Sequence, residues 1–177
     1  MLAACSGGAD PSPAPVAVTT TITETGTPTP SASAVPVLPD AAKQPTRPGA
    51  EAFFRYFMAV YSSSLRTLDP APVESLSEAT CTACKNVLET MADARTKGDR
   101  FSGGAIQVVM AVAAPDDPSR GLLVQAIIDQ TTLTRLNSKG VEQASSPSLS
   151  GQRVDAALRW TGAAWKVLEL QYVKPGA

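Results

Sequence analysis

The N-terminal quarter of the chain sets the strongest limit on the fold, because it cannot contribute to a compact core. Residues 6–48 consist mainly of Pro, Thr, Ser, Ala and Gly, contain no aromatic residue, and hold nine of the 15 prolines. Such a composition buries too little apolar surface to offset the conformational entropy lost on ordering. We therefore expect residues 6–48 to form a disordered spacer and one folded domain to occupy residues 49–174.

The residues before the spacer include a cysteine that follows a short run of small and apolar residues. The run LAACSGG places Cys5 directly behind small residues. It resembles the bacterial lipobox, in which the cysteine carries diacylglycerol and becomes the N-terminus after cleavage. We therefore expect residues 1–5 to be a lipobox remnant, Cys5 to be lipidated, and the rest of a signal peptide to lie upstream. This predicts an extracytoplasmic protein, lipid-anchored to the bacterial cell membrane.

Charge and composition exclude several classes of function. The net charge is -1 and the isoelectric point is near 5.4, so no basic field attracts nucleic acid. No segment approaches the ~20 apolar residues that a membrane-spanning helix requires. The sequence contains no histidine, which removes the usual general base and the commonest zinc ligand. We expect no metal, no cofactor and no nucleic-acid partner.

The first predicted helix carries five of the nine aromatic residues. The stretch AEAFFRYFMAVYSSSLRTL, residues 50–68, places its large apolar residues on one helical stripe. This stripe comprises Phe53, Phe54, Phe57, Met58, Tyr61, Leu65 and Leu68. The opposite face is expected to carry Glu51, Arg55, Ser62 and Arg66, with Glu51 and Arg55 forming an i,i+4 ion pair.

Two shorter helices are expected to follow. Asp69 and Pro70 predict the start of a short helix that buries Val73 and Leu76. Thr80 is expected to cap a third helix, which ends at Gly98. Its inward residues are predicted to be Cys84, Val87, Leu88 and Met91.

After residue 104 the hydrophobic period changes to two, which predicts strands. In AIQVVMAVAA, residues 105–114, the inward face is expected to hold Ile106, Val108, Met110 and Val112. A turn at residues 116–121 leads to a long strand over residues 122–136. Residues 137–151 read as a polar loop.

The closing hairpin LRWTGAAWKVLEL joins two further strands, over residues 152–160 and 165–173. Its inward residues are predicted to be Val154, Ala156, Leu158 and Trp160. At least one of Trp160 and Trp165 is expected to cover the base of the first helix. The sum is an α+β fold in which three N-terminal helices pack on a curved four-stranded antiparallel sheet.

These elements together resemble the nuclear transport factor 2-like cone. The segments GAEAFFRYFMAVYSSS and LSEATCTACKNVLETM, with Cys5 and the spacer, are similar to a family of uncharacterised actinobacterial lipoproteins. The resemblance covers Cys5 and residues 49–174. It implies a cone-shaped domain, an envelope location and a capacity to form homodimers through the sheet, and it implies no reaction.

The sharpest local motif is CTAC, which spaces Cys81 and Cys84 by three residues. Helical spacing brings their Cα atoms within bridging distance, so a structural disulfide in an oxidising compartment is favoured. Free core thiols and the redox pair of a thiol–disulfide oxidoreductase are the alternatives, although a redox pair usually follows a strand. A structural zinc site is not expected, because it needs four ligands and Cys5 is the only other cysteine in a sequence without histidine.

An aspartate and two tyrosines form the second candidate site. Asp129 interrupts an apolar strand, and Tyr56 and Tyr61 lie on the first helix. Several enzymes of the cone fold use such residues, so an isomerase or dehydratase with Asp129 as its base is an alternative function. Asp129 could also mark a bulge or a pocket entrance, and a satisfied or solvated aspartate is the favoured interpretation. The favoured interpretation is a non-catalytic domain that binds an envelope protein or a small apolar ligand.

Overall fold

The structure is a computed structural model that describes residues 36–114 and 121–174. Cys5, most of the expected spacer and most of the expected turn at residues 116–121 lie outside the described residues. Ordered structure begins before the predicted boundary at Gly49. A 3-10 helix, η1 (Asp40–Lys43), buries Ala42 and packs against the first α-helix. The folded unit therefore includes the end of the segment that we expected to be a spacer.

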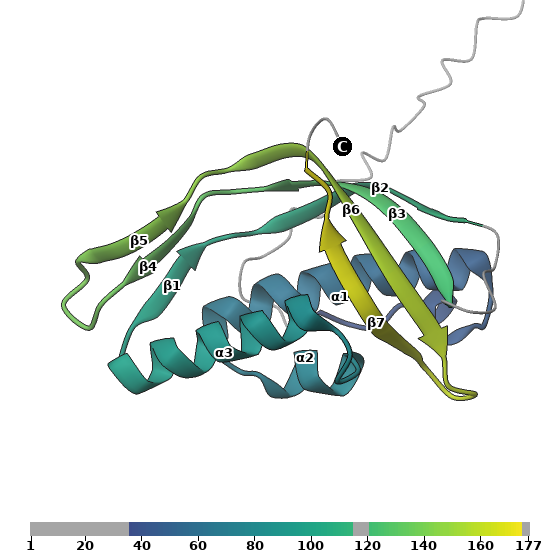
Figure 1. The fold of residues 1–177 in the computed structure, drawn as a ribbon, viewed down its shortest axis with the longest axis horizontal. Coiled ribbons are helices and arrows are strands. Elements are labelled where there is room, and N and C mark those ends of the chain that lie inside the picture. The colour runs from purple at the N-terminus through teal and green to yellow at the C-terminus, as the bar shows by residue number, and fades with distance from the viewer. Residues whose placement is uncertain (1–35, 115–120, 175–177) are drawn as a thin grey trace, which may run out of the picture. The chain divides into compact units, whose positions relative to one another are not determined.

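Three α-helices follow, as predicted, and they are α1 (Arg47–Thr67), α2 (Ala71–Leu76) and α3 (Thr82–Lys97) (Figure 1). The hydroxyl of Thr46 caps α1 by accepting a hydrogen bond from the Gly49 N–H at 3.1 Å. The carboxylate of Asp69 accepts one from the Ala71 N–H at 3.2 Å and starts α2. Gly98 ends α3 in the left-handed conformation, at φ 67°.

The predicted cap of α3 was wrong. Cys81 occupies the N-cap position, and its sulfur accepts a hydrogen bond from the Cys84 N–H at 3.2 Å. Thr80 instead donates its hydroxyl to the Leu168 carbonyl at 3.0 Å. Thr80 therefore ties the loop between α2 and α3 to the sheet.

The apolar stripe of α1 is buried as predicted except at Tyr61 and Leu68, which are partly buried. The polar face differs from the prediction in two ways. Ser62 is buried rather than exposed, because α1 contacts α2 as well as β1, β2 and β3 and its buried arc is correspondingly wide. Glu51 and Arg55 do not pair with each other. Each reaches the strand beside α1, where Glu51 bonds the Ala113 N–H and Arg55 bonds the Val108 carbonyl.

Seven strands form two antiparallel sheets. They are β1 (Arg100–Gly103), β2 (Ile106–Ala113), β3 (Leu122–Gln130), β4 (Leu133–Leu136), β5 (Glu142–Ser146), β6 (Leu149–Trp160) and β7 (Trp165–Tyr172). The larger sheet has the order β2-β3-β6-β7, and the smaller one has the order β1-β4-β5. Two-residue links join β1 to β2, β3 to β4 and β5 to β6, so the small sheet continues the large one beyond a bend (Figure 1).

The polar loop expected at residues 137–151 was wrong in part. Residues 142–146 form β5, and β6 begins at Leu149. Every residue of β5 is exposed, so neither face supplies the hydrophobic alternation that identifies a strand.

The inward face predicted for β2 was correct for its first half only. Val108 pairs with Ile128 and Met110 pairs with Ile127, so Val109 is an extra residue in a β-bulge. The bulge reverses the alternation, because an inserted residue turns every later side chain to the opposite face. Ala111 and Ala113 consequently point into the core, whereas Val109, Met110 and Val112 are 54%, 48% and 47% exposed.

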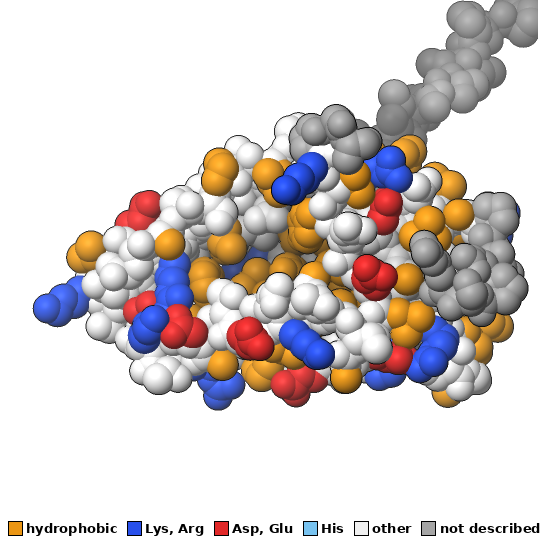
Figure 2. Space-filling view, in the orientation of Figure 1, with side chains coloured by type: hydrophobic (Ala, Val, Ile, Leu, Met, Phe, Trp, Pro, Cys, Tyr) orange, Lys and Arg blue, Asp and Glu red, His pale blue; other side chains and the backbone are white. Residues whose placement is uncertain are grey.

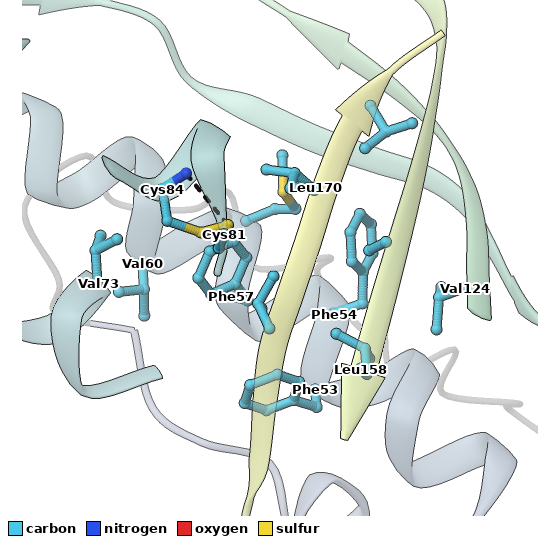
Figure 3. Packing of buried hydrophobic residues seen from close by; sticks show 14 of the residues in the cluster. Phe53, Phe54, Phe57, Val60, Val73, Cys81, Cys84, Val124, Leu158 and Leu170 are labelled. Carbon is cyan, nitrogen blue, oxygen red and sulfur yellow. Dashed lines mark hydrogen bonds between the residues drawn. A yellow bond between two sulfur atoms is a disulfide. The ribbon is translucent and has the colours of Figure 1, made fainter. Parts of the chain in front are cut away.

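The core lies between α1 and the inner face of the large sheet (Figure 3). Phe53, Phe54 and Phe57 of α1 pack there against residues of β3, β6 and β7, including Leu158. Trp165 is 5% exposed, and its indole N–H donates to the Gln44 carbonyl at 3.0 Å, so it covers the start of α1. Its ring meets that of Trp160 edge-on at 5.4 Å.

Candidate functional site

Cys81 and Cys84 are joined by a disulfide at the start of α3, with 5.2 Å between their Cα atoms. Both residues are buried, at 0% and 1% exposure, and they pack beside Phe57 and Val60 (Figure 3). Redox-active cysteines are partly exposed, because a partner thiol has to reach a sulfur atom. The arrangement at α3 suits a bridge that fastens a helix start to the core.

Asp129 lies on the sheet face away from α1, because its neighbour Ile128 is the residue that points into the core. The register between β3 and β6 shifts at this point, and the Asp129 carboxylate accepts a hydrogen bond from the Gly151 N–H at 2.8 Å. Asp129 thus satisfies a backbone group at a bulge. This is one of the two roles that the sequence suggested for it.

The two tyrosines project from α1 on the other side of the sheet. Tyr56 packs with its ring 6.5 Å from that of Phe53, and Tyr61 lies 6.3 Å from Phe57. Burial raises the pKa of Tyr61, and nearby Tyr172 at the end of β7 raises it further. Burial also raises the pKa of Tyr172. Near neutral pH both phenols stay protonated, so they can donate hydrogen bonds but cannot act as bases. The structure does not bring Asp129 together with them.

A groove of about 730 Å³ opens on the outer face of the large sheet, where sequence reasoning had placed no site. Its floor consists of small and aliphatic residues, among them Leu123, Ala157 and Leu168. Gly121 at its end has φ +80°, and a Cβ there would lie 2.5 Å from the Leu158 carbonyl oxygen, so only glycine fits. In the sequence, the one indication of this groove is Ala157, a small residue at an outward position of β6 between Asp155 and Arg159.

The rim of the groove is polar and largely neutralised by ion pairs. Arg159 of β6 pairs with Glu78 from the loop after α2, and Arg153 pairs with Asp155 at 3.1 Å. Glu169 and Gln171 of β7 complete the rim. Figure 2 shows this face, with acidic side chains lying between basic ones over β6 and β7. A hollow with an apolar floor and polar rim is suited to binding a ligand or a protein side chain.

In the part of the chain that the structure describes, no helix is both long and apolar enough to cross a membrane. The same residues contain no group of three or more His, Cys, Asp or Glu side chains placed to hold a metal ion.

Three helices packed on a bent antiparallel sheet define a nuclear transport factor 2-like α+β domain, as the sequence predicted. The chain belongs to a family described as "Family of unknown function (DUF6318)", whose model matches residues 24–171. No curated protein matches the chain. The α+β fold of the predicted class is confirmed by the structure, and the lipoprotein part of the resemblance stays a prediction.

Among solved structures, the intermembrane space region of the chloroplast protein ARC6 is similar, with a TM-score of 0.55 at 10% identity. The match covers 73% of this chain and 98% of that one, so it supports a shared fold. Aln2 from a Streptomyces species has 12% identity and a TM-score of 0.43, covering 71% and 89%. The beta subunit of benzoate 1,2-dioxygenase from Burkholderia mallei has 12% identity and a TM-score of 0.47, covering 69% and 88%.

Proposed function

We propose that this protein is lipid-anchored at the outer face of the bacterial cell membrane and that its folded domain binds an envelope protein without catalysing a reaction. The anchor is supported by Cys5 in LAACSGG and by the Pro- and Thr-rich run that follows it. A buried disulfide at α3 agrees with an oxidising compartment.

The observation that carries the non-catalytic proposal is the separation of the candidate acid from the tyrosines. Asp129 lies on the outer face of the sheet and holds the Gly151 N–H, whereas Tyr61 lies on α1. The interior between them is filled by core side chains, including Phe54 and Met58, both with no exposed area. A filled interior favours an outer binding surface and disfavours a small apolar ligand inside the cone.

The proposed binding surface is the outer face of β2, β3, β6 and β7. The groove supplies a concave floor, and Met110 and Val112 of β2 supply exposed apolar side chains on the same face. Exposed apolar groups beside a polar rim are typical of protein interaction sites. A second copy of this chain is the alternative occupant of this face.

The anchor is tested by metabolic labelling with a fatty-acid analogue in cells that express the protein from its native gene. Wild type should incorporate the label, and a Cys5→Ala variant should not. The double Cys81→Ser/Cys84→Ser variant is the matched control and should label like wild type. Equal labelling of the Cys5→Ala variant would refute the anchor.

The binding surface is tested by placing a photo-reactive amino acid at Val112 of the anchored protein in living cells. A discrete crosslinked product of higher mass is expected from Val112. The control position is Val141, which is 57% exposed in the turn before β5 and lies off the outer face of the large sheet. Identical products from both positions, or none from Val112, would contradict the proposal.

A further inference from the structure

The free edge of β2 combines two features that normally lead to strand pairing between molecules. β2 is the edge strand of the large sheet, so one side of its backbone has no neighbouring strand. Its sequence IQVVMAVA contains no charged residue, and three of its apolar side chains are exposed. Exposed, uncharged and apolar edge strands are templates for adding another strand.

Three side chains of α1 occupy the outward-facing backbone groups of this edge. Arg47 donates from Nε to the Ala113 carbonyl at 3.1 Å, and Glu51 accepts the Ala113 N–H at 2.8 Å. Arg55 donates to the Val108 carbonyl. These residues follow one another at intervals of four, so they form one row along α1. They make the hydrogen bonds that an incoming strand would otherwise make.

The row leaves little of the edge open. Ala114 donates its N–H inward to the Leu123 carbonyl, whereas Ala113 turns both of its backbone groups outward. Because these directions alternate along an antiparallel strand, Ala111 is the next residue whose N–H and C=O face outward. A partner strand would need the groups of Ala113 as well as those of Ala111. The row therefore interrupts the edge at both ends of its apolar stretch.

The opposite edge of the sheet, β7, is covered as well. The Glu78 N–H donates to the Val167 carbonyl at 2.9 Å, and Thr80 donates to the Leu168 carbonyl. At Val167 the β7 edge is thus closed by main chain, and at Leu168 it is closed by a side chain of the same loop. The β2 edge is closed only by side chains, which can swing away.

We infer that the edge of β2 is a strand-pairing surface for a second copy of this chain, and that Arg47, Glu51 and Arg55 hold it closed. A second copy fits because an antiparallel pair of β2 strands sets identical uncharged, apolar strands against each other about a two-fold axis, with no like charges opposed. This inference does not depend on the lipid anchor. It implies that partners of the native protein approach the face of the sheet rather than its edge.

The test uses the full chain and measures molar mass by light scattering after size-exclusion chromatography. Wild type should elute as a monomer, and the Arg47→Ala/Glu51→Ala/Arg55→Ala variant should show a twofold mass at the same concentration. Arg66→Ala is the matched control, because this α1 arginine bonds Ser62 within the helix and should leave the mass unchanged. Adding Met110→Lys to the triple variant should restore the monomer, since lysine on an edge strand opposes pairing.

Hydrogen exchange provides a readout that does not depend on association. In dilute monomeric protein, Glu51→Ala should speed exchange of the Ala113 amide by about tenfold or more, because that amide loses its acceptor. If the triple variant does not fold, Glu51→Ala alone still tests whether these side chains close the β2 edge. A folded triple variant that stays monomeric, an Ala113 amide that exchanges at the wild-type rate, or a wild-type dimer abolished by Met110→Lys would each overturn the inference.

Discussion

The two faces of the large sheet differ in what they can tolerate. The inner face presents Val124, Val154 and Leu158 to α1, and none of these side chains has measurable exposure. The outer face presents Met110 and Val112 to solvent beside a groove that is floored by small residues. Close-packed interiors lose stability when atoms are removed, whereas exposed side chains can change at little cost. Stability and binding should therefore be separable in this domain.

The largest expected effect is on the inner face, at Trp165. Replacing Trp165 by alanine should lower the free energy of unfolding by about 3–5 kcal/mol. The variant loses a buried indole and leaves the Gln44 carbonyl without the donor it has in wild type. Urea denaturation monitored by circular dichroism measures the change.

The control for Trp165→Ala is Met110→Ala on the outer face, which should alter stability by no more than about 0.5 kcal/mol. Trp160→Ala should fall between the two, because Trp160 is only partly buried. If Met110→Ala destabilised the domain as much as Trp165→Ala, the two faces would not be separable.

The next effect in size concerns the disulfide. The double Cys81→Ser/Cys84→Ser variant should lose about 2 kcal/mol, because the bridge closes a very short loop, and slightly more because the new hydroxyls are buried. Mass spectrometry of the exported wild type should find both thiols blocked. Insulin-reducing activity that disappears in the variant would contradict the structural role and indicate an oxidoreductase.

The elements with a clear hydrophobic period were the ones that the sequence predicted well. The stripe of α1 and the alternation of β6 stand out because polar residues separate their apolar ones. In β2 apolar residues lie on both faces, so the sequence does not show which of them point into the core. The bulge at Val109 therefore could not be recognised. In β5 both faces are polar, and the strand was missed for the converse reason. Pairing with a neighbouring strand decides both cases, and it is not local in sequence.

The candidate site was predictable only as a set of residues. The alternatives for Asp129 were a pocket base and a bulge marker, and only the position of Gly151 on the adjacent strand separates them. The pairing of Glu51 with Arg55 was the natural local expectation for a helix surface. It fails because the edge of β2 offers both side chains backbone partners. Where the local pattern is ambiguous, residues that are distant in the sequence therefore decide which partner a side chain has.

A smaller effect is expected from Asp129→Ala, on the outer face. The variant should lose about 1 kcal/mol, because the Gly151 N–H loses a charged acceptor at the bulge but remains near water. Crosslinking through Val112 should be unchanged, since Asp129 serves the backbone in this interpretation. Asp129→Asn is the matched control and should retain most of the stability through its amide oxygen. Loss of crosslinking without loss of stability would place Asp129 in the binding surface.

The smallest effect should appear only at alkaline pH and belongs to the inner side. Burial raises the pKa of Tyr61 above its usual value of 10.0, so the folded chain keeps the phenol proton when the unfolded chain releases it. Stability from this group is therefore fully present below about pH 10 and declines as the pH rises further. Tyr61→Phe removes the titration and should flatten the loss of stability between pH 7 and about pH 11. At pH 7 the same variant should differ little from wild type, because the hydroxyl has no hydrogen-bond partner among residues 36–114 and 121–174.

Thermal melts of wild type and Tyr61→Phe at the two pH values measure the difference. Tyr172→Phe should produce the same kind of change, because burial alone raises the pKa of Tyr172. If wild type and both variants lost stability equally as the pH rises, these phenols would be exposed to solvent, and the end of β7 would not belong to the buried inner face.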